Sequence, residues 1–283
     1  MSDKPISTWT LFEASFPPDD RPLDASIFQP LIARRADYED AFYGRLAESP
    51  AYCVLVVAWN SEAVYDAFAA SPEGGARLLA NLAAAGADGG EAEGDGPKQQ
   101  QQQRGQRPVT TRKVDFGNMP FWWRFGPNTE VRTVYFPSGN EQRQKETREA
   151  MGRLKGLVLS MGLGIDGRMA HLSPYRGVPA RGWVTSEEVK GGKVEKNDGE
   201  STTGVVTWEG REVSACLWIH YWKNKKAEQT FKTTERRPPP DGESHRPLAL
   251  EAFEDGLRRL GALGWVDYHV DFEKVPRALW QTA

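Results

Sequence analysis

The sequence repeats one pattern twice, each time around a tryptophan that ends an apolar strand. Trp59 follows the apolar run 53–58, and Trp222 follows the apolar run 216–221. Phe68 and Phe231 lie at the same distance after these tryptophans. Two further pairs occur in the same order, Phe16-Pro17 with Phe136-Pro137 and Val114-Asp115-Phe116 with Val270-Asp271-Phe272. Four ordered matches predict a duplicated unit, with an insertion in the second copy.

The pattern divides the chain into two predicted units, residues 8–117 and 129–275, each with the order β-α-β-α-β and an irregular strand before the central one. Residues 84–108 lack apolar periodicity, which predicts a disordered insert, and residues 176–211 are expected to form a loop or an exposed hairpin. The expected strands are 9–16, 52–59, 112–116, 130–136, 213–222 and 265–272; the expected helices are 30–44, 61–82, 138–161 and 248–263.

Composition argues against several classes of partner. The net charge of the 283 residues is −3, so the chain has no overall positive field for nucleic acid. Cys53 and Cys216 are the only cysteines, and both lie in apolar strand runs, which indicates a reduced, intracellular protein. The first residues lack an apolar signal core, and no run has the length of a membrane span. We therefore expect a soluble, cytoplasmic protein that binds neither nucleic acid nor membrane.

Residues 59–72 carry a family resemblance. Trp59-Asn60-Ser61-Glu62-Ala63, followed by Phe68 and Ser71-Pro72, resembles the strand-to-helix corner of the antibiotic biosynthesis monooxygenase-like family, in the dimeric α+β-barrel superfamily. The second copy has Lys223-Asn224-Lys225-Lys226 at this corner, so the resemblance there extends only to spacing and element order. The matched residues themselves are expected to be structural, with Trp59 and Phe68 between helix and sheet and Ser61 as a helix cap.

The resemblance implies an α+β fold of two tandem ferredoxin-like units. In such a fold each antiparallel sheet packs helices on one face, and the two sheets close an intramolecular barrel on the other. It also implies a monomer with an internal pseudo-dimer, of the fused two-unit type found in fungi. Members of the family include cofactor-independent oxygenases of aromatic polyketides, haem-degrading relatives and proteins with no known activity.

Strand 213–222 is expected to present two different faces, because side chains alternate along a strand. One face carries Trp218, His220 and Trp222, which predicts a pocket with aromatic walls and one polar group. His220 is therefore a candidate catalytic base, with Trp218 and Trp222 as substrate-binding residues. The alternative is a buried neutral histidine satisfied by a hydrogen bond. The opposite face is expected to pack on helices and holds Val213, Ala215, Leu217, Ile219 and Tyr221.

Two other histidines are weaker candidates. His269 lies between Asp267 and Asp271 on one side of a strand, where carboxylates would orient the imidazole and make it a second candidate base. The alternative for this trio is a solvated polar face. His171 is a candidate substrate-binding residue at a pocket rim, and His245 is expected to be exposed. The sequence has no metal-ligand, phosphate-binding or serine-nucleophile motif, so we expect neither metal nor cofactor.

Two functional hypotheses follow. The first is a cofactor-independent enzyme of secondary metabolism, a monooxygenase or a cyclase or isomerase, acting on an aromatic or polyketide-like small molecule in the barrel pocket. The second is a non-catalytic α+β-barrel protein that binds a small molecule or another protein. A pocket where titratable groups converge favours the enzyme, whereas an interior filled by side chains favours the second hypothesis.

Overall fold

Antiparallel strands with helices make up each of two units in the computed structural model. The structure describes residues 4–14, 24–85, 109–151, 154, 174–190, 205–235 and 247–277. Unit 1 comprises Met1–Asn118, Thr185–Val205 and Phe272–Ala283, and unit 2 comprises Met119–Val184 and Val206–Asp271. Both units therefore join segments that are distant in the sequence, unlike the predicted ranges 8–117 and 129–275.

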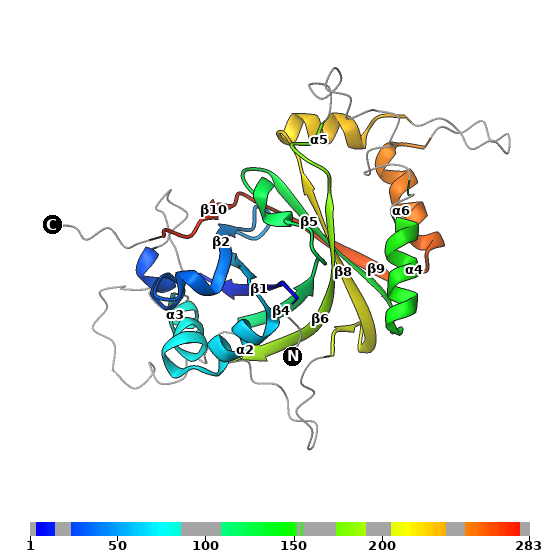
Figure 1. Ribbon diagram of the computed structural model, residues 1–283. Helices are drawn as coiled ribbons and strands as arrows, with labels where there is room; N and C mark the ends of the chain where they lie inside the picture. The colour runs from blue at the N-terminus through cyan, green and yellow to red at the C-terminus, as the bar shows by residue number, and fades with distance from the viewer. Residues whose placement is uncertain are drawn as a thin grey trace, which may run out of the picture. The chain divides into compact units, whose positions relative to one another are not determined.

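In unit 1, the strands lie in the order β10-β2-β3-β1-β4, with β6 next to β4. The pairs β10–β2, β2–β3, β3–β1 and β1–β4 are antiparallel. Figure 1 shows α2 and α3 on the same side of these strands. The elements are β1 (Ile6–Glu13), η1 (Ala25–Phe28), α1 (Gln29–Ile32), η2 (Arg35–Asp37), β2 (Tyr38–Arg45), β3 (Tyr52–Trp59), α2 (Glu62–Ala70), the π-helical turn η3 (Pro72–Ala76), α3 (Arg77–Ala85), β4 (Val109–Asp115) and β10 (Glu273–Lys274).

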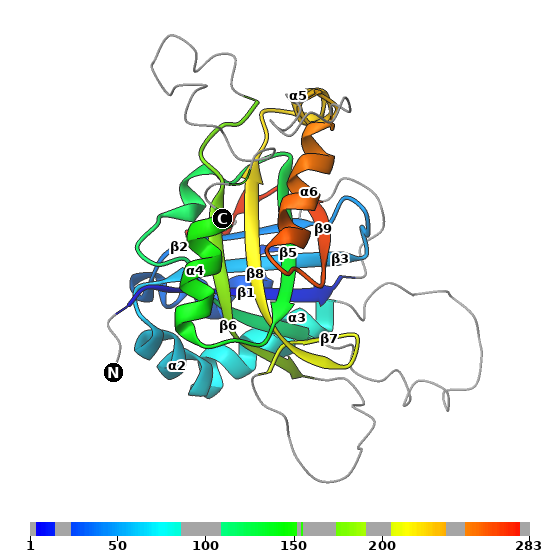
Figure 2. The same cartoon turned by 90° about the vertical axis from the view of Figure 1, so that its right-hand side faces the viewer.

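In unit 2, the strand order is β6-β8-β5-β9, again antiparallel, with β7 paired to β8. Figure 2 shows α4 and α6 on the same face of these strands. The elements are η5 (Phe121–Arg124), β5 (Thr129–Pro137), α4 (Glu141–Met151), β6 (Ala180–Lys190), which continues into unit 1, β7 (Thr207–Trp208), β8 (Arg211–Tyr221), α5 (Lys225–Lys232), α6 (Ala249–Arg259) and β9 (Gly264–Val270).

Each unit has the ferredoxin-like strand order, in which the first and third strands are central and the second and fourth flank them. This order is β2-β3-β1-β4 in unit 1 and β6-β8-β5-β9 in unit 2. The predicted α+β class with two ferredoxin-like units is confirmed. No helix within the described residues is both long enough and apolar enough to cross a membrane.

Strand register supports the predicted duplication. The first strand of each unit pairs with both neighbours in the same way: Ser7 with Ala58 and Val114 in unit 1, and Thr129 with Tyr221 and Val270 in unit 2. Trp59 thus corresponds to Trp222, and Phe116 corresponds to Phe272, as the sequence pattern predicts. The same register matches Phe136 with Ala14; the predicted partner of Phe136 lies outside the described residues.

The two tryptophans also make equivalent hydrogen bonds. Trp59 Nε1 donates to Thr8 Oγ1 at 2.9 Å, and Trp222 Nε1 donates to Glu130 Oε2 at 2.7 Å. Thr8 and Glu130 are the residues after the matched pair Ser7 and Thr129, so they occupy the same position in the two first strands. Each indole therefore ties the third strand of its unit to the first.

The helix caps after the tryptophans are equivalent as well. The Ser61 side chain accepts from the backbone N–H of Val64, and the Asn224 side chain accepts from that of Ala227. Asparagine caps a helix about as well as serine. The changed corner sequence of the second copy therefore preserves the local structure.

Two sequence predictions about secondary structure are wrong. The helix expected over 30–44 ends at Ile32, and Tyr38–Arg45 form strand β2, because pairing with β3 buries Ala41 and Phe42 on opposite faces of the sheet. The exposed hairpin expected within 176–211 includes strand β6, whose Trp183 and Val184 are buried. Tertiary contacts outweigh local pattern in both segments. Residues 86–108, within the predicted insert, lie outside the described part of the chain.

Candidate functional site

A cluster of charged side chains lies against the helix-covered face of the unit 2 sheet. Glu130 and Arg132 come from β5, His220 from β8 and His269 from β9. They meet Glu228 and Lys232 of α5, which lie one helical turn apart. Glu130, Arg132 and His220 are fully or almost fully buried. Buried ionisable groups are costly unless they are paired, and such groups are common at functional sites.

Glu130 is the centre of this cluster. Its carboxylate accepts from Trp222 Nε1 at 2.7 Å, from Lys232 Nζ at 3.1 Å and from Arg132 at 3.4 Å. Burial by itself would raise the pKa of Glu130, but the positive charges facing it and the indole hydrogen bond lower that pKa to about 2. Glu130 is therefore ionised at neutral pH. Arg132 also pairs with Asp267 at 2.6 Å and with Glu254 at 3.3 Å, so the guanidinium is balanced on two sides.

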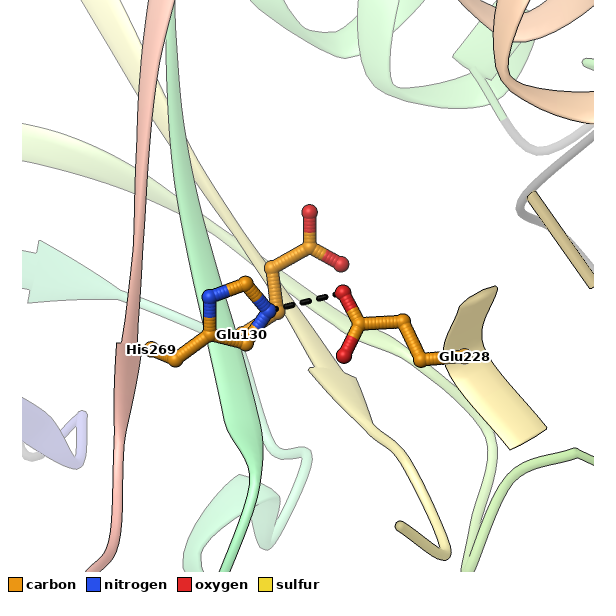
Figure 3. A group of neighbouring side chains, drawn as sticks. All are labelled: Glu130, Glu228 and His269. Atoms are coloured by element: carbon orange, nitrogen blue, oxygen red, sulfur yellow. Dashed lines mark hydrogen bonds and ion pairs between the residues drawn. The ribbon is translucent and has the colours of Figure 1, made fainter. Parts of the chain in front are cut away.

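Glu228 and His269 form a carboxylate–histidine pair (Figure 3). Glu228 Oε1 lies 2.7 Å from His269 Nε2 and 2.6 Å from Lys232 Nζ, and Asn128 Nδ2 donates to Glu228 Oε2 at 3.0 Å. Burial opposes ionisation of Glu228, but the hydrogen bonds from His269 and Lys232 outweigh burial and lower its pKa. Because the ionised carboxylate only accepts, Nε2 of His269 carries a hydrogen, and in the neutral imidazole the lone pair is then on Nδ1. The His269 side chain is 22 % exposed.

Glu130, Glu228 and His269 also carry donor atoms of the kinds that bind metal ions. Ligand atoms of Glu130, Glu228 and His269 all lie within 4.8 Å of one another. However, Lys232 Nζ contacts both carboxylates, at 3.1 and 2.6 Å, and already supplies their positive charge. The two carboxylates raise the pKa of Lys232 against the effect of burial, so the ammonium keeps its proton. A divalent ion bound to these three residues would have to displace the Lys232 ammonium from both carboxylates.

His220 does not lie where the sequence suggested. The predicted faces of strand 213–222 are reversed: Trp218 and His220 pack edge-on against Phe253 of α6, and Trp222 packs against Phe231 of α5. Trp218 and Trp222 share a buried apolar core with Phe253 and Leu257 of α6, so this face of the strand gains the larger apolar contact by meeting the helices. His220 is stacked between the indoles of Trp218 and Trp222, at ring distances of 5.6 and 5.8 Å.

The environment of His220 makes it a weak base. Burial lowers its pKa to about 3, although the Glu130 carboxylate 3.6 Å from Nδ1 acts in the opposite direction. Neither ring nitrogen has a hydrogen-bond partner among the described residues. His220 therefore lacks the hydrogen bond expected of a buried neutral histidine, and its pKa is too low for a general base at neutral pH. His171 and His245 lie outside the described residues.

Asp267 and Asp271, the expected carboxylate partners of His269, bind other groups. Asp267 pairs with Arg132, and Asp271 accepts from the backbone N–H of Asn128. Sequence reasoning missed Glu130, Arg132, Glu228 and Lys232. A signal for the first two was present, because they are the only charged residues of strand 129–137 and occupy alternate positions in it. Glu228 and Lys232 carried no such signal on a helix of mixed polarity.

Unit 1 has a cleft at the place where unit 2 has its charged cluster. Register matches Thr8, Thr10 and Thr111 with Glu130, Arg132 and Asp267. The cleft measures about 440 Å³, including the open space at its mouth. The walls are apolar or carry hydroxyl groups, with Glu188 as the single carboxylate; they include Thr8, Thr10, Val57, Trp59, Tyr65 and Ala69.

Comparisons with known proteins give only distant structural likenesses. No protein-family model matches the chain, and no curated protein matches it. An "anthrone oxidase-like protein" of known structure is 14 % identical, with a TM-score of 0.44 over 97 % of this chain and 94 % of that one. A "putative monooxygenase" from Lactobacillus acidophilus is 7 % identical, with a TM-score of 0.43 over 96 % and 95 %.

A third structure, a "putative monooxygenase" from Fusobacterium nucleatum, is 9 % identical, with a TM-score of 0.42 over 97 % of this chain and 96 % of that one. Likenesses at these identities and scores assign no function. Functional inference therefore depends on the two sites described above.

Proposed function

We propose that the protein is a cofactor-independent enzyme that removes a proton from an aromatic or polyketide-like small molecule, with His269 as the general base. The hydrogen bond between Glu228 and His269 carries this proposal. A catalytic base needs a fixed tautomer and orientation, and a hydrogen-bonded carboxylate provides both. Glu228 is itself held by Lys232 and Asn128, so the imidazole has a rigid support.

His269 is a better base than His220 on two grounds. The His269 side chain is partly exposed, whereas His220 is fully buried. A base with a pKa of about 3, such as His220, has little affinity for a substrate proton at neutral pH. His220 instead forms part of the aromatic stack behind the cluster.

The proposed reaction is oxidation initiated by proton removal. His269 Nδ1 takes a proton from an acidic C–H or phenolic O–H of the substrate, and the resulting anion donates electrons to O₂. For anthrone, a tricyclic ketone with an acidic CH₂ group, one O₂ is consumed, and the products are one anthraquinone and one water. Cyclisation or isomerisation would begin with the same proton transfer and would not consume O₂.

Oxygen uptake with anthrone tests this proposal. We expect the wild-type protein to consume oxygen faster than protein-free buffer, and His269→Gln to lower kcat/KM by about 10²–10⁴-fold. Glu228→Gln should lower kcat, because the amide holds the imidazole less firmly than the carboxylate. His245→Gln is the matched control and should keep full activity. Oxygen uptake at the buffer rate, or full activity of His269→Gln, would reject the proposed enzyme.

The unit 1 cleft favours a second candidate, binding without catalysis. Its walls offer apolar surface and neutral hydroxyl groups, as binding sites for small neutral molecules do. Ala69 lines this cleft, whereas Ala67 on the same helix is exposed. If unit 1 binds a neutral aromatic molecule, Ala69→Met should weaken binding of p-cresol at least 10-fold, and Ala67→Met should have no effect in calorimetry. Equal binding by both variants would reject this candidate.

A further inference from the structure

Asn128, the residue before strand β5, contacts the carboxylate that orients His269. Asn128 is almost fully buried, and its Nδ2 donates to Glu228 Oε2 at 3.0 Å. The other carboxylate oxygen, Oε1, faces Lys232 Nζ at 2.6 Å and His269 Nε2 at 2.7 Å (Figure 3). Within the described residues, Oε2 therefore depends on Asn128 for its hydrogen bond.

Hydrogen bonds to both oxygens are needed to fix the plane of the Glu228 carboxylate. The last side-chain torsion of glutamate has a broad energy profile, so the carboxylate turns readily unless both oxygens are held. Lys232 and His269 hold only Oε1. The bond from Asn128 to Oε2 therefore sets the plane of the carboxylate, and with it the direction of the hydrogen bond to the imidazole.

The conformation of Asn128 is one that most residues avoid. Its φ is 56°, in the left-handed region, which asparagine tolerates better than most other residues. Its backbone N–H donates to Asp271 Oδ1 at 2.6 Å, and Asp271 lies two residues after His269. Its side-chain Oδ1 is buried without a hydrogen-bond partner among the described residues. A left-handed backbone and an unsatisfied carbonyl both destabilise a fold, and such features gather at functional sites.

Unit 1 shows that the ferredoxin-like framework does not need this asparagine. The strand registers place Ile6 of β1 at the position of Asn128. By register and by distance from the helix cap, Lys113 and Tyr65 occupy the positions of the histidine and the carboxylate. Asn128 thus occurs in the unit that has the carboxylate–histidine pair, and an apolar residue replaces it in the unit that lacks the pair.

We propose that Asn128 is a positioning residue for His269 and acts through Glu228. Its left-handed backbone, held by Asp271, directs the amide at Oε2, and the amide keeps Oε1 in line with His269 Nε2. The consequence for catalysis rests on the proposed function, in which His269 is the base. The effect on the hydrogen bond between Glu228 and His269 does not depend on any reaction.

Asn128→Gly tests this role, because glycine keeps the left-handed backbone and the N–H that Asp271 accepts but removes the amide. NMR of isotope-labelled histidine, with His269→Gln to assign the signal, follows the Nε2 hydrogen of His269. We expect this hydrogen to exchange with water at least about 10-fold faster than in the wild type, because a hydrogen bond to a charged group is lost. With anthrone, kcat should fall about 10–100-fold, as for a small displacement of a catalytic group, and KM should change less than about 2-fold.

Asn60→Gly is the matched control. Asn60 donates from Nδ2 to the carbonyl of Ala36 in unit 1, so this variant also loses one amide hydrogen bond. It should change neither the exchange rate nor kcat. Equal effects of the two glycine variants would indicate a general loss of stability and would overturn the proposal.

An unchanged exchange rate in Asn128→Gly would also overturn the proposal, whatever the activity. If the wild type consumes no oxygen with anthrone, the proposed reaction fails, but the exchange rate still decides the role of Asn128. If Asn128→Gly does not fold, Asp271→Ala gives the test, because it releases the backbone of Asn128 and should speed exchange. Its control is Asp115→Ala at the matched position of unit 1, where Asp115 accepts from the N–H of Gly117. Equal exchange in these two alanine variants would then overturn the proposal.

Discussion

His220→Leu is the substitution that most directly tests the structure of the charged cluster. Both nitrogens of His220 are buried without a hydrogen-bond partner among the described residues, and the matched position in unit 1 is Val57. Leucine has a similar volume and leaves no polar atom unsatisfied. Since an unsatisfied buried polar group costs about 1–3 kcal/mol, we expect His220→Leu to preserve or raise the free energy of unfolding at pH 7.5 by up to that amount.

The same substitution should remove much of the acid sensitivity of the protein. The pKa of His220 is lowered to about 3 in the folded state, from 6.5 in the unfolded state. Below pH 6.5 the unfolded state therefore binds more protons, so this stability is complete above pH 6.5 and is lost as the pH falls towards 3. The loss is at most about 1.4 kcal/mol per pH unit, or about 3 kcal/mol between pH 6.5 and 4.5.

The charged groups around His220 limit the pH range in which its titration can be measured separately from theirs. Glu130, Arg132, Lys232 and Glu228 all act on its imidazole. Glu130 has a folded pKa of about 2 against 4.5 when unfolded, so its own contribution is lost only below about pH 4.5. If the pH dependence of the unfolding free energy between pH 7.5 and 4.5 disappears in His220→Leu, the titration of His220 causes that dependence.

Urea unfolding followed by circular dichroism, at half-unit steps from pH 7.5 to 4.5, measures both effects. Val57→Leu is the control, because it places the same side chain at the matched position of unit 1 and should leave the pH dependence unchanged. Our interpretation of the cluster is wrong if His220→Leu loses as much stability as the wild type on acidification. It is also wrong if the variant is more than about 2 kcal/mol less stable at pH 7.5.

Two further predictions concern the partners of Glu130. Trp222→Phe removes an indole hydrogen bond to a buried carboxylate and should lower the unfolding free energy by about 1.5–3 kcal/mol; Trp59→Phe removes a bond to a neutral hydroxyl and should cost about 1 kcal/mol. Equal losses would show that ionisation of Glu130 is unimportant. Lys232→Met leaves two buried carboxylates without their shared ammonium and should cost about 3–5 kcal/mol in thermal or urea unfolding, whereas exposed Lys225→Met should change stability by less than about 0.5 kcal/mol. Similar values for the two lysine variants would contradict the paired cluster.

The fold was largely predictable from short-range features of the sequence. The tryptophans at 59 and 222 end strands in matching registers, and the apolar stripe over 248–263 forms helix α6, with Phe253 and Leu257 buried. The segment 38–45 was not predictable, because its apolar residues satisfy a helical spacing and a paired strand about equally well. Pairing with β3 decided between the two.

The arrangement of the candidate site was out of reach of the sequence for a physical reason. His220 could be singled out as a polar residue in an apolar strand and His269 by its neighbouring aspartates, but alternation along a strand identifies two faces without showing which one meets the helices. Glu130 and Glu228 lie almost a hundred residues apart, and only the packing of α5 on the sheet brings them to one ammonium. The sequence by itself determined most of the strands and the framework of two units. The tertiary structure determined which charges are buried together, because pairing and desolvation depend on distances that no local pattern encodes.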